Sequence, residues 1–183
     1  MTAVETISGC SILPTIHDQT NEYVYHGTPL RLDEIEPREC RFWLRGQYVP
    51  DTEVPVVCAT DEPIIAAFRA LVPRTSELFG CGRARNRWGG FDFLVQNEAR
   101  HELERAVGYV ALGTKQEFDI YKPPDISALS SITEYRRQDV FRPKANVEID
   151  YTDFEEMCFT PGSRNRLLYL KGERRIGSVA LAA

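Results

Sequence analysis

Three short stretches of the sequence carry residue types that could recognise or transform a small polar ligand. The first is "YHGT", residues 25–28, where an expected strand over 22–25 leads into a histidine, a glycine and a hydroxyl. A plain turn is one interpretation, because glycine supplies backbone freedom and Pro29 cannot donate to a strand ladder. In the other interpretation, a planar ligand lies against the bare backbone of Gly27, with polar side chains on both sides.

The second stretch is "VVCATDEPIIAAFRA", residues 56–70, which predicts a strand running into a helix. Thr60 is a suitable helix cap, and Pro63 falls in the first turn, where its missing N–H does no harm. Phe68 lies on the apolar face of this helix by its spacing, which favours a core position. The wall of a ligand pocket is the alternative, since a core face and a pocket wall can be one surface.

The third stretch is "TEYRRQDV", residues 133–140, where Glu134 opens an expected strand. A carboxylate on an exposed strand is commonly a solvated charge. In a ligand site it could instead stabilise a developing positive charge. The arginines of "CGRARNRWGG" (Arg83, Arg85 and Arg87) are interpreted as a solvated loop in preference to a phosphate site.

Composition limits the class of protein. The chain has 183 residues, is 43% hydrophobic and 27% charged, and carries a net charge of −5. These values predict one folded domain over 21–183, preceded by an N-terminal arm over 1–20. The negative charge argues against a dedicated nucleic-acid binder, because its field repels phosphates.

Cysteine use and the N-terminus bear on location. The five cysteines form no C-x-x-C pair and no zinc-like spacing with histidine, so we expect free thiols, no metal and a reducing compartment. No basic leader and no apolar run of about 20 residues is present, so neither secretion nor a membrane partner is expected. The expected location is the cytoplasm.

The expected elements are many short strands and few helices. Strands are expected over 22–25, 54–60, 91–96, 108–114, 132–140 and 144–151, with 166–171 either a last strand or a tail. Helices are expected over 61–72, 97–106 and 152–157, the last opened by a T-x-x-E capping box at Thr152. A loop is expected over 41–53 and a long connection over 75–90. The pattern predicts an α+β fold on a mixed or split sheet. It does not suggest a doubly wound dinucleotide fold, and no G-x-G-x-x-G or P-loop motif is present.

In their order and setting, "YHGT", "VVCATDEPIIAAF" and "TEYRRQDV" resemble the signature of the ADP-ribosyltransferase superfamily, of the diphtheria-toxin and poly(ADP-ribose) polymerase type. The resemblance covers roughly residues 21–150 and implies a split mixed or antiparallel sheet with few short helices. It implies a mono-ADP-ribosyltransferase that takes NAD as substrate, breaks the nicotinamide–ribose bond and transfers ADP-ribose to a macromolecular acceptor. Such a transferase needs no metal.

The resemblance also implies roles for individual residues. Glu134 would contact the 2′-hydroxyl of the nicotinamide ribose and stabilise an oxocarbenium-like state. His26 would hydrogen-bond the adenosine ribose, the Gly27 backbone would bond the nicotinamide amide, and Thr28 would add a hydroxyl contact. Phe68 would stack on the nicotinamide ring.

Two departures from the family pattern affect these expectations. Val57 stands where the polymerase branch often has a tyrosine that forms one aromatic wall of the nicotinamide site. Tyr25 or Tyr135 would have to supply this aromatic wall, with Thr60 beside it. Ile132, two residues before the glutamate, replaces the acidic or amide residue linked to arginine modification.

Three functions therefore stay open. The first is an active transferase with an unknown acceptor, a protein in preference to a nucleic acid. The second is an inactive interaction protein with the same fold. The third is an NAD-dependent enzyme like the RNA 2′-phosphotransferases, although the arginines do not fall into that family's pattern.

Overall fold

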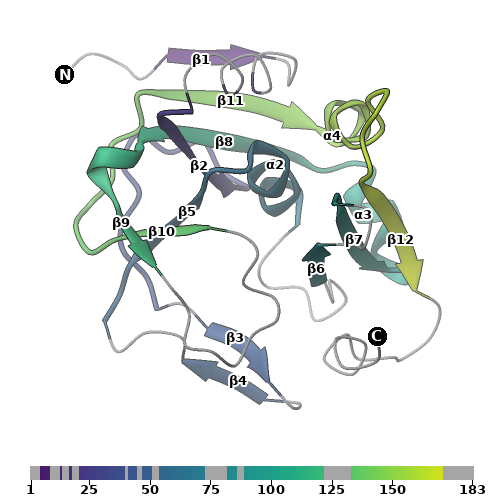
Figure 1. Ribbon diagram of the computed structural model, residues 1–183, viewed down its shortest axis with the longest axis horizontal. Coiled ribbons are helices and arrows are strands. Elements are labelled where there is room, and N and C mark those ends of the chain that lie inside the picture. Colours follow the sequence, from purple (N-terminus) through teal and green to yellow (C-terminus); the bar gives the residue numbers. More distant parts are fainter. Residues whose placement is uncertain are drawn as a thin grey trace.

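The computed structural model describes residues 5–8, 13, 17, 21–39, 41–44, 47–50, 54–72, 82–85, 89–121 and 133–170. Within them the chain is an α+β protein with a mixed, mostly antiparallel main sheet and three short α-helices, as the sequence predicts (Figure 1).

The main sheet has seven strands in the order β1-β11-β8-β2-β5-β10-β9. Its strands are β1 (Glu5–Ser8), β11 (Ala145–Asp150), β8 (Val107–Thr114), β2 (Tyr23–Thr28), β5 (Val57–Thr60), β10 (Glu134–Arg137) and β9 (Asp119–Tyr121). All neighbours pair antiparallel except β1 and β11, which are parallel. Residues 5–8 of the expected N-terminal arm thus form an edge strand of this sheet.

Two smaller sheets complete the strands of the described residues. The order β12-β7-β6 joins β12 (Arg166–Leu170), β7 (Phe91–Gln96) and β6 (Gly82–Arg85), and a hairpin joins β3 (Arg41–Leu44) to β4 (Gln47–Pro50). The loop expected over 41–53 was therefore wrong, since its β-favouring aromatic residues form strands. The connection expected over 75–90 likewise contains β6, and β9 was not predicted.

The helices are α2 (Pro63–Leu71), α3 (Arg100–Leu103) and α4 (Tyr151–Cys158), and two short 3₁₀ turns span Asn97–Ala99 and Lys115–Glu117. Pro63 occupies the first turn of α2 as predicted, but Glu62 is the N-cap residue. The Thr60 hydroxyl accepts the Glu62 N–H at 3.1 Å, so it closes the turn before the helix and does not cap it.

Helix α4 begins at Tyr151, one residue before the expected start, and its N-cap is Asp150 in place of Thr152. Asp150 accepts the Asp153 N–H at 2.9 Å, and the Asp153 carboxylate accepts the Asp150 N–H at 3.1 Å. This reciprocal capping box displaces the one predicted at Thr152, which lies inside the helix.

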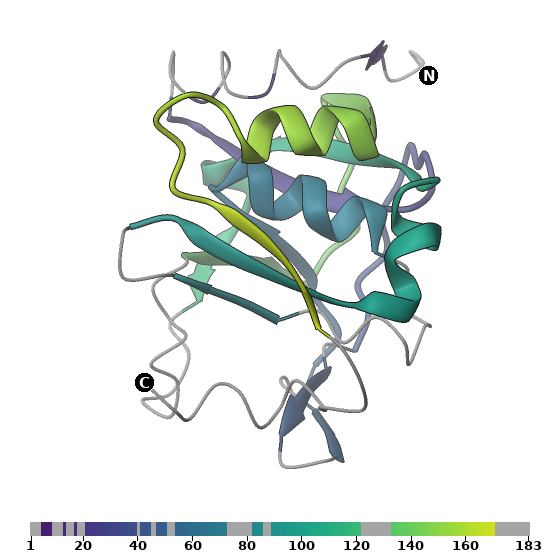
Figure 2. The ribbon, with the colours of Figure 1, turned by 90° about the vertical axis from the view of Figure 1, so that its right-hand side faces the viewer.

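Apolar side chains cover both faces of the main sheet. On one face, α2 and α4 lie side by side and pack with β7 and β12 into the larger core, which contains Phe68, Phe93 and Phe154 (Figure 2). The smaller core on the opposite face contains Val24, Val57, Ala59, Ala111 and Tyr135, covered by Ile35, Phe118 and Phe141. We call these the helix face and the opposite face.

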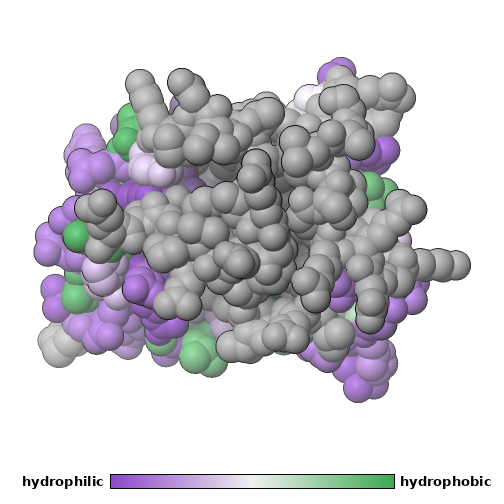
Figure 3. All heavy atoms as spheres, turned by 90° about the horizontal axis from the view of Figure 1, so that it is seen from below, coloured by the Kyte–Doolittle hydropathy of each residue, from purple (hydrophilic) through white to green (hydrophobic). Residues whose placement is uncertain are grey.

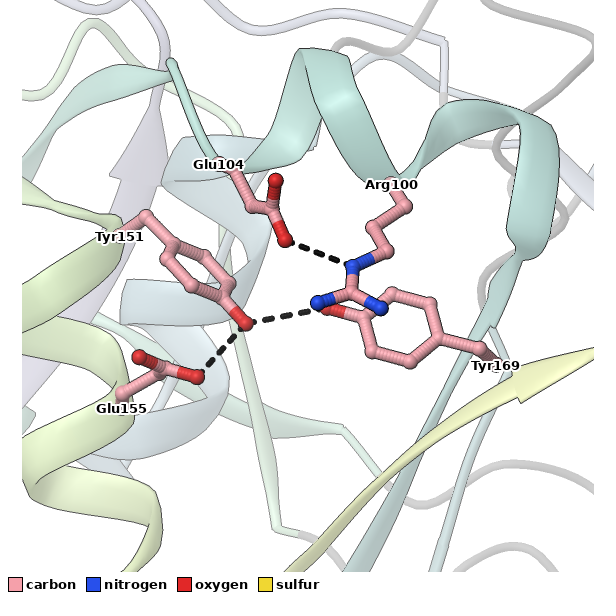
Figure 4. Close-up of polar contacts among 5 residues, drawn as sticks. All are labelled: Arg100, Glu104, Tyr151, Glu155 and Tyr169. Carbon is pink, nitrogen blue, oxygen red and sulfur yellow. Dashed lines mark hydrogen bonds and ion pairs between the residues drawn. The ribbon is translucent and has the colours of Figure 1, made fainter.

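A polar cluster joins α3, α4 and β12 at the margin of the larger core (Figure 4). The Tyr151 hydroxyl donates to Glu155 at 2.8 Å, so Tyr169 must be the donor in the 3.0 Å contact between the two hydroxyls. Arg100 lies 4.9 Å from the Tyr169 ring centroid and donates to Glu104 at 2.6 Å. Burial raises the pKa of Tyr151, which keeps this hydroxyl chain neutral. The cluster fastens β12 to both helices.

Large apolar side chains on the surface are scattered. Leu30, Val54, Val107, Ile120 and Phe159 are exposed, and they come from separate parts of the fold. On the face seen from below, the described residues are mainly hydrophilic (Figure 3). No helix in the described part of the chain combines the length and the apolar character needed to cross a bilayer.

Candidate active site

The sequence-predicted residues meet where the main sheet changes from β2 to β5. Thr60 pairs with Tyr25 of β2 on one side and with Glu134 of β10 on the other. Directly opposed residues of antiparallel strands point to the same face, so these three side chains form a row on the helix face.

The ladder between β2 and β5 is interrupted after one residue pair, Tyr25 with Thr60. By contrast, β2 pairs with β8 without a break from Tyr23 to Thr28. The sheet therefore consists of two half-sheets, β1-β11-β8-β2 and β5-β10-β9, joined by a single pair. We call the stretch beyond this pair, between 26–28 of β2 and 57–59 of β5, the β2/β5 gap.

The peptide groups of Gly27 point into the β2/β5 gap. Lys115 N–H donates to the Glu22 carbonyl at 2.8 Å, so residue 22 directs its peptide groups toward β8. Successive residues of an antiparallel strand alternate in this direction, which turns the N–H and C=O of Gly27 toward β5. No residue pair joins β2 to β5 at this position. A carboxamide could receive one hydrogen bond from this edge and donate another to it.

His26 borders the same gap. It is 7% exposed, and its Nδ1 lies 2.6 Å from the carbonyl oxygen of Cys58. A carbonyl only accepts, so Nδ1 carries the proton. The imidazole thus donates to the Cys58 carbonyl, which in a continuous ladder would accept from a backbone N–H of β2. This hydrogen bond links β2 to β5 across the gap.

Glu134, the first residue of β10, lies in the row with Thr60 and Tyr25, two residues along β2 from Gly27, and is held by Arg136. The Arg136 Nε donates to Glu134 Oε1 at 2.9 Å, and side-chain exposures are 20% for the glutamate and 8% for the arginine. The guanidinium carbon of Arg136 lies 3.1 Å from the Tyr121 ring centroid. The carboxylate is thus fixed in place and still partly open to a ligand.

Tyr135 faces away from this carboxylate, into the smaller core. Its hydroxyl donates to Asp61 at 3.3 Å, and Lys115 lies 3.7 Å from the same carboxylate oxygen. Burial, together with the charge of Asp61, raises the pKa of Tyr135 to about 12. Tyr135 therefore ties β10 to the start of α2.

The other predicted ligand contacts lie in packed or bonded positions. Phe68 is 3% exposed, with its ring centroid 4.7 Å from that of Phe93 and 5.5 Å from that of Phe154. These contacts fit the core position that its helical spacing favoured, and stacking on a nicotinamide would require the ring to leave them. The Thr28 hydroxyl donates to the Leu30 carbonyl at 3.1 Å and closes the end of β2.

The interpretation of Gly27 as part of a plain turn is wrong, because β2 runs through it to Thr28. A Cβ at Gly27 would stand 2.0 Å from the Ala66 carbonyl and 2.8 Å from the Ala70 nitrogen, both in α2. The close approach of α2 is the physical reason for glycine here. A bulky residue at Gly27 would therefore displace the helix, and it cannot serve as a test of ligand binding with the fold intact.

Arg136 and Tyr121 are site residues that sequence reasoning missed. The signal for Arg136 was its spacing of two from Glu134 on a strand, which places both side chains on one face. Tyr121 had no such signal, since β9 was not predicted and its pairing with Glu134 depends on the fold.

Several predicted features lie outside the described side chains. Cys10, Cys40, Cys81 and Arg87 are outside the described residues, as are the side chains of Arg83 and Arg85. In the described part of the chain, Cys58 is half-buried and Cys158 is buried, and both are free thiols. No group of three metal-ligating side chains occurs among the described residues.

Comparison with known proteins gives no relative on which to base an assignment. No family model, no curated protein and no solved structure matches the chain.

Proposed function

We propose that the protein is a mono-ADP-ribosyltransferase that binds NAD at the β2/β5 gap. The proposal rests chiefly on the interruption of the ladder after Tyr25 and Thr60, which leaves the Gly27 peptide edge directed at the gap. The carboxamide of nicotinamide can donate one hydrogen bond to the Gly27 carbonyl and accept another from the Gly27 N–H. The division into two half-sheets is consistent with the split core of the ADP-ribosyltransferase fold.

Glu134 would carry the chemical step. The bond between nicotinamide and C1′ of the ribose breaks, and its electrons neutralise the pyridinium nitrogen as nicotinamide leaves. The cationic ribose that develops is stabilised by the carboxylate, which also holds the 2′-hydroxyl. The acceptor nucleophile then bonds to C1′ and loses a proton. A protein acceptor is proposed, since the net charge of −5 disfavours a nucleic acid.

The test compares nicotinamide release from NAD by wild type, Glu134→Gln and a matched control, Glu102→Gln, which changes an exposed carboxylate of α3. Glu134→Gln should lower the release rate by about 10²-fold, the scale found for one electrostatic stabiliser of a transition state. NAD should raise the melting temperature of all three proteins similarly, since a ligand that binds only the folded state stabilises it. Equal release by Glu134→Gln and wild type would remove Glu134 from the mechanism.

A catalytically silent NAD-binding module is the second candidate. It is favoured by the ion pair of Glu134 with Arg136, in which a guanidinium already partly neutralises the carboxylate. A melting shift with NAD but no nicotinamide release from wild type, with or without candidate acceptor proteins, would support this function over the first.

A further inference from the structure

Arg69, in the last turn of α2, lies over Gly27, which borders the β2/β5 gap. Its Cβ would lie 2.9 Å from a Cβ built on Gly27, whose peptide groups point into that gap. Helix α2 comes this close to β2 because Gly27 meets it without a side chain. The same residue thus presents its peptide groups to the gap and, lacking a side chain, lets an arginine come close to them.

The surroundings of Arg69 differ from those of the other half-buried arginines. It is half-buried, yet no acidic side chain or hydrogen-bond acceptor pairs with it among the described residues. In contrast, Arg137 lies 4.0 Å from Glu117, and Arg166 is paired with Asp92. A partly desolvated guanidinium without a counter-charge favours binding of an anion, because pairing recovers part of the desolvation cost.

We propose that Arg69 binds the diphosphate of a dinucleotide whose carboxamide end lies at Gly27. The inference rests on the proposed function and deepens it, since it assigns the phosphate contact of the same site. A guanidinium offers two parallel N–H donors to phosphate oxygens, which lysine cannot reproduce. The alternative role is structural, because a cation near a helix C-terminus also stabilises the helix dipole.

The experiment measures the Kd of ADP, ADP-ribose and nicotinamide by calorimetry for full-length wild type, Arg69→Gln and Arg69→Lys. Arg105→Gln is the matched control, since Arg105 is exposed and has no ion pair among the described residues. Because a charge-assisted contact is lost, Arg69→Gln should bind ADP and ADP-ribose with a Kd about 10- to 100-fold higher than wild type. Nicotinamide affinity should stay unchanged. The ADP affinity of Arg69→Lys should lie between those of wild type and Arg69→Gln. Raising the salt concentration should weaken ADP binding by wild type more than by Arg69→Gln.

Equal ADP affinity in Arg69→Gln and wild type would overturn the inference, as would an equal loss for nicotinamide and ADP. Absence of ADP binding by wild type would overturn it as well. Nicotinamide release by wild type is measured in parallel and separates the two claims. If wild type releases nicotinamide and Arg69→Gln binds ADP as tightly as wild type does, only the role of Arg69 is refuted. If ADP binding depends on Arg69 but wild type releases no nicotinamide, only the proposed transferase activity is refuted.

Discussion

At Glu134, the ion pair with Arg136 sets both the position of the carboxylate and the charge that a ligand would meet. Arg136 is itself fixed, because its guanidinium lies against the Tyr121 ring and is almost fully buried. A carboxylate held in this way loses little freedom when a ribose binds. In the proposed transferase, Arg136 would therefore position Glu134 without touching the reacting atoms.

Replacement of Arg136 should separate turnover from binding. Arg136→Gln should lower the rate of nicotinamide release by about 10-fold or more, because a small displacement of a catalytic group reduces the reaction rate strongly. The melting shift with NAD should persist, and Arg136→Lys should recover part of the rate. The control is Arg142→Gln, since Arg142 forms an exposed ion pair with Glu34. An unchanged rate in Arg136→Gln would show that the ion pair has no part in the chemistry.

The sequence indicated the position of one of these residues and missed the packing around another. The helical spacing of Phe68 indicated a core position, because periodicity reports the face of a helix directly. The glycine at position 27 was attributed to a turn or to a ligand. Its contact with Ala66 could not be foreseen, since it depends on how a helix 39 residues later packs on the strand. Local sequence does not encode such an approach.

Among the elements, α2 approaches the main sheet closely, and small residues on both sides allow it. Gly108 of β8 repeats the arrangement of Gly27, with a Cβ position only 2.4 Å from the Ala70 carbonyl. Because α2 starts at the end of β5 and packs on β2 and β8, it connects the half-sheets on the helix face.

A methyl group at position 27 should therefore force α2 away from the sheet. Gly27→Ala should lower the free energy of unfolding by about 1–3 kcal/mol, the usual cost of overpacking, or more if the backbone of α2 cannot shift. Val107→Ala, at an exposed position of β8, should change it by about 0.5 kcal/mol or less. Urea unfolding at neutral pH measures both variants. A Gly27→Ala protein as stable as wild type would contradict the packing described.

Prediction of the elements succeeded where one signal dominated and failed where two competed. Strand β5 and the Pro63 start of α2 were clear, because β-branched residues lead straight into a proline at the first helical position. At α4, Asp150 and Thr152 both resemble caps, and only the reciprocal bond with Asp153 distinguishes them. Hairpin β3–β4 was missed although its strands carry the β-favouring residues Phe42, Trp43 and Tyr48.

At the scale of the whole molecule, alkaline pH should reveal how strongly the start of α2 is tied to β10. The pKa of Tyr135 is raised to about 12 in the folded protein, against about 10 for an unfolded tyrosine. The folded state thus favours the neutral phenol, and its contribution to stability is complete below pH 10. That contribution is lost as pH rises toward 12, because only the unfolded state then releases the proton.

Tyr135→Phe provides the measurement. The free energy of unfolding of wild type should fall between pH 10 and 12 by up to about 1.4 kcal/mol per pH unit more steeply than that of Tyr135→Phe. Tyr109, whose pKa is raised by its hydrogen bond to Glu148, contributes equally in both proteins and cancels. Parallel curves for the two proteins would show that Tyr135 titrates normally in the folded state.

The single pair between β2 and β5 also gives the main sheet a mechanical weak line. Every other neighbouring pair of strands in that sheet is joined by at least three residue pairs in register. Under tension applied across the strands in an optical trap, rupture should begin between Tyr25 and Thr60. The load would then pass to α2, whose packing against Gly27 and Gly108 becomes the tether that resists complete separation.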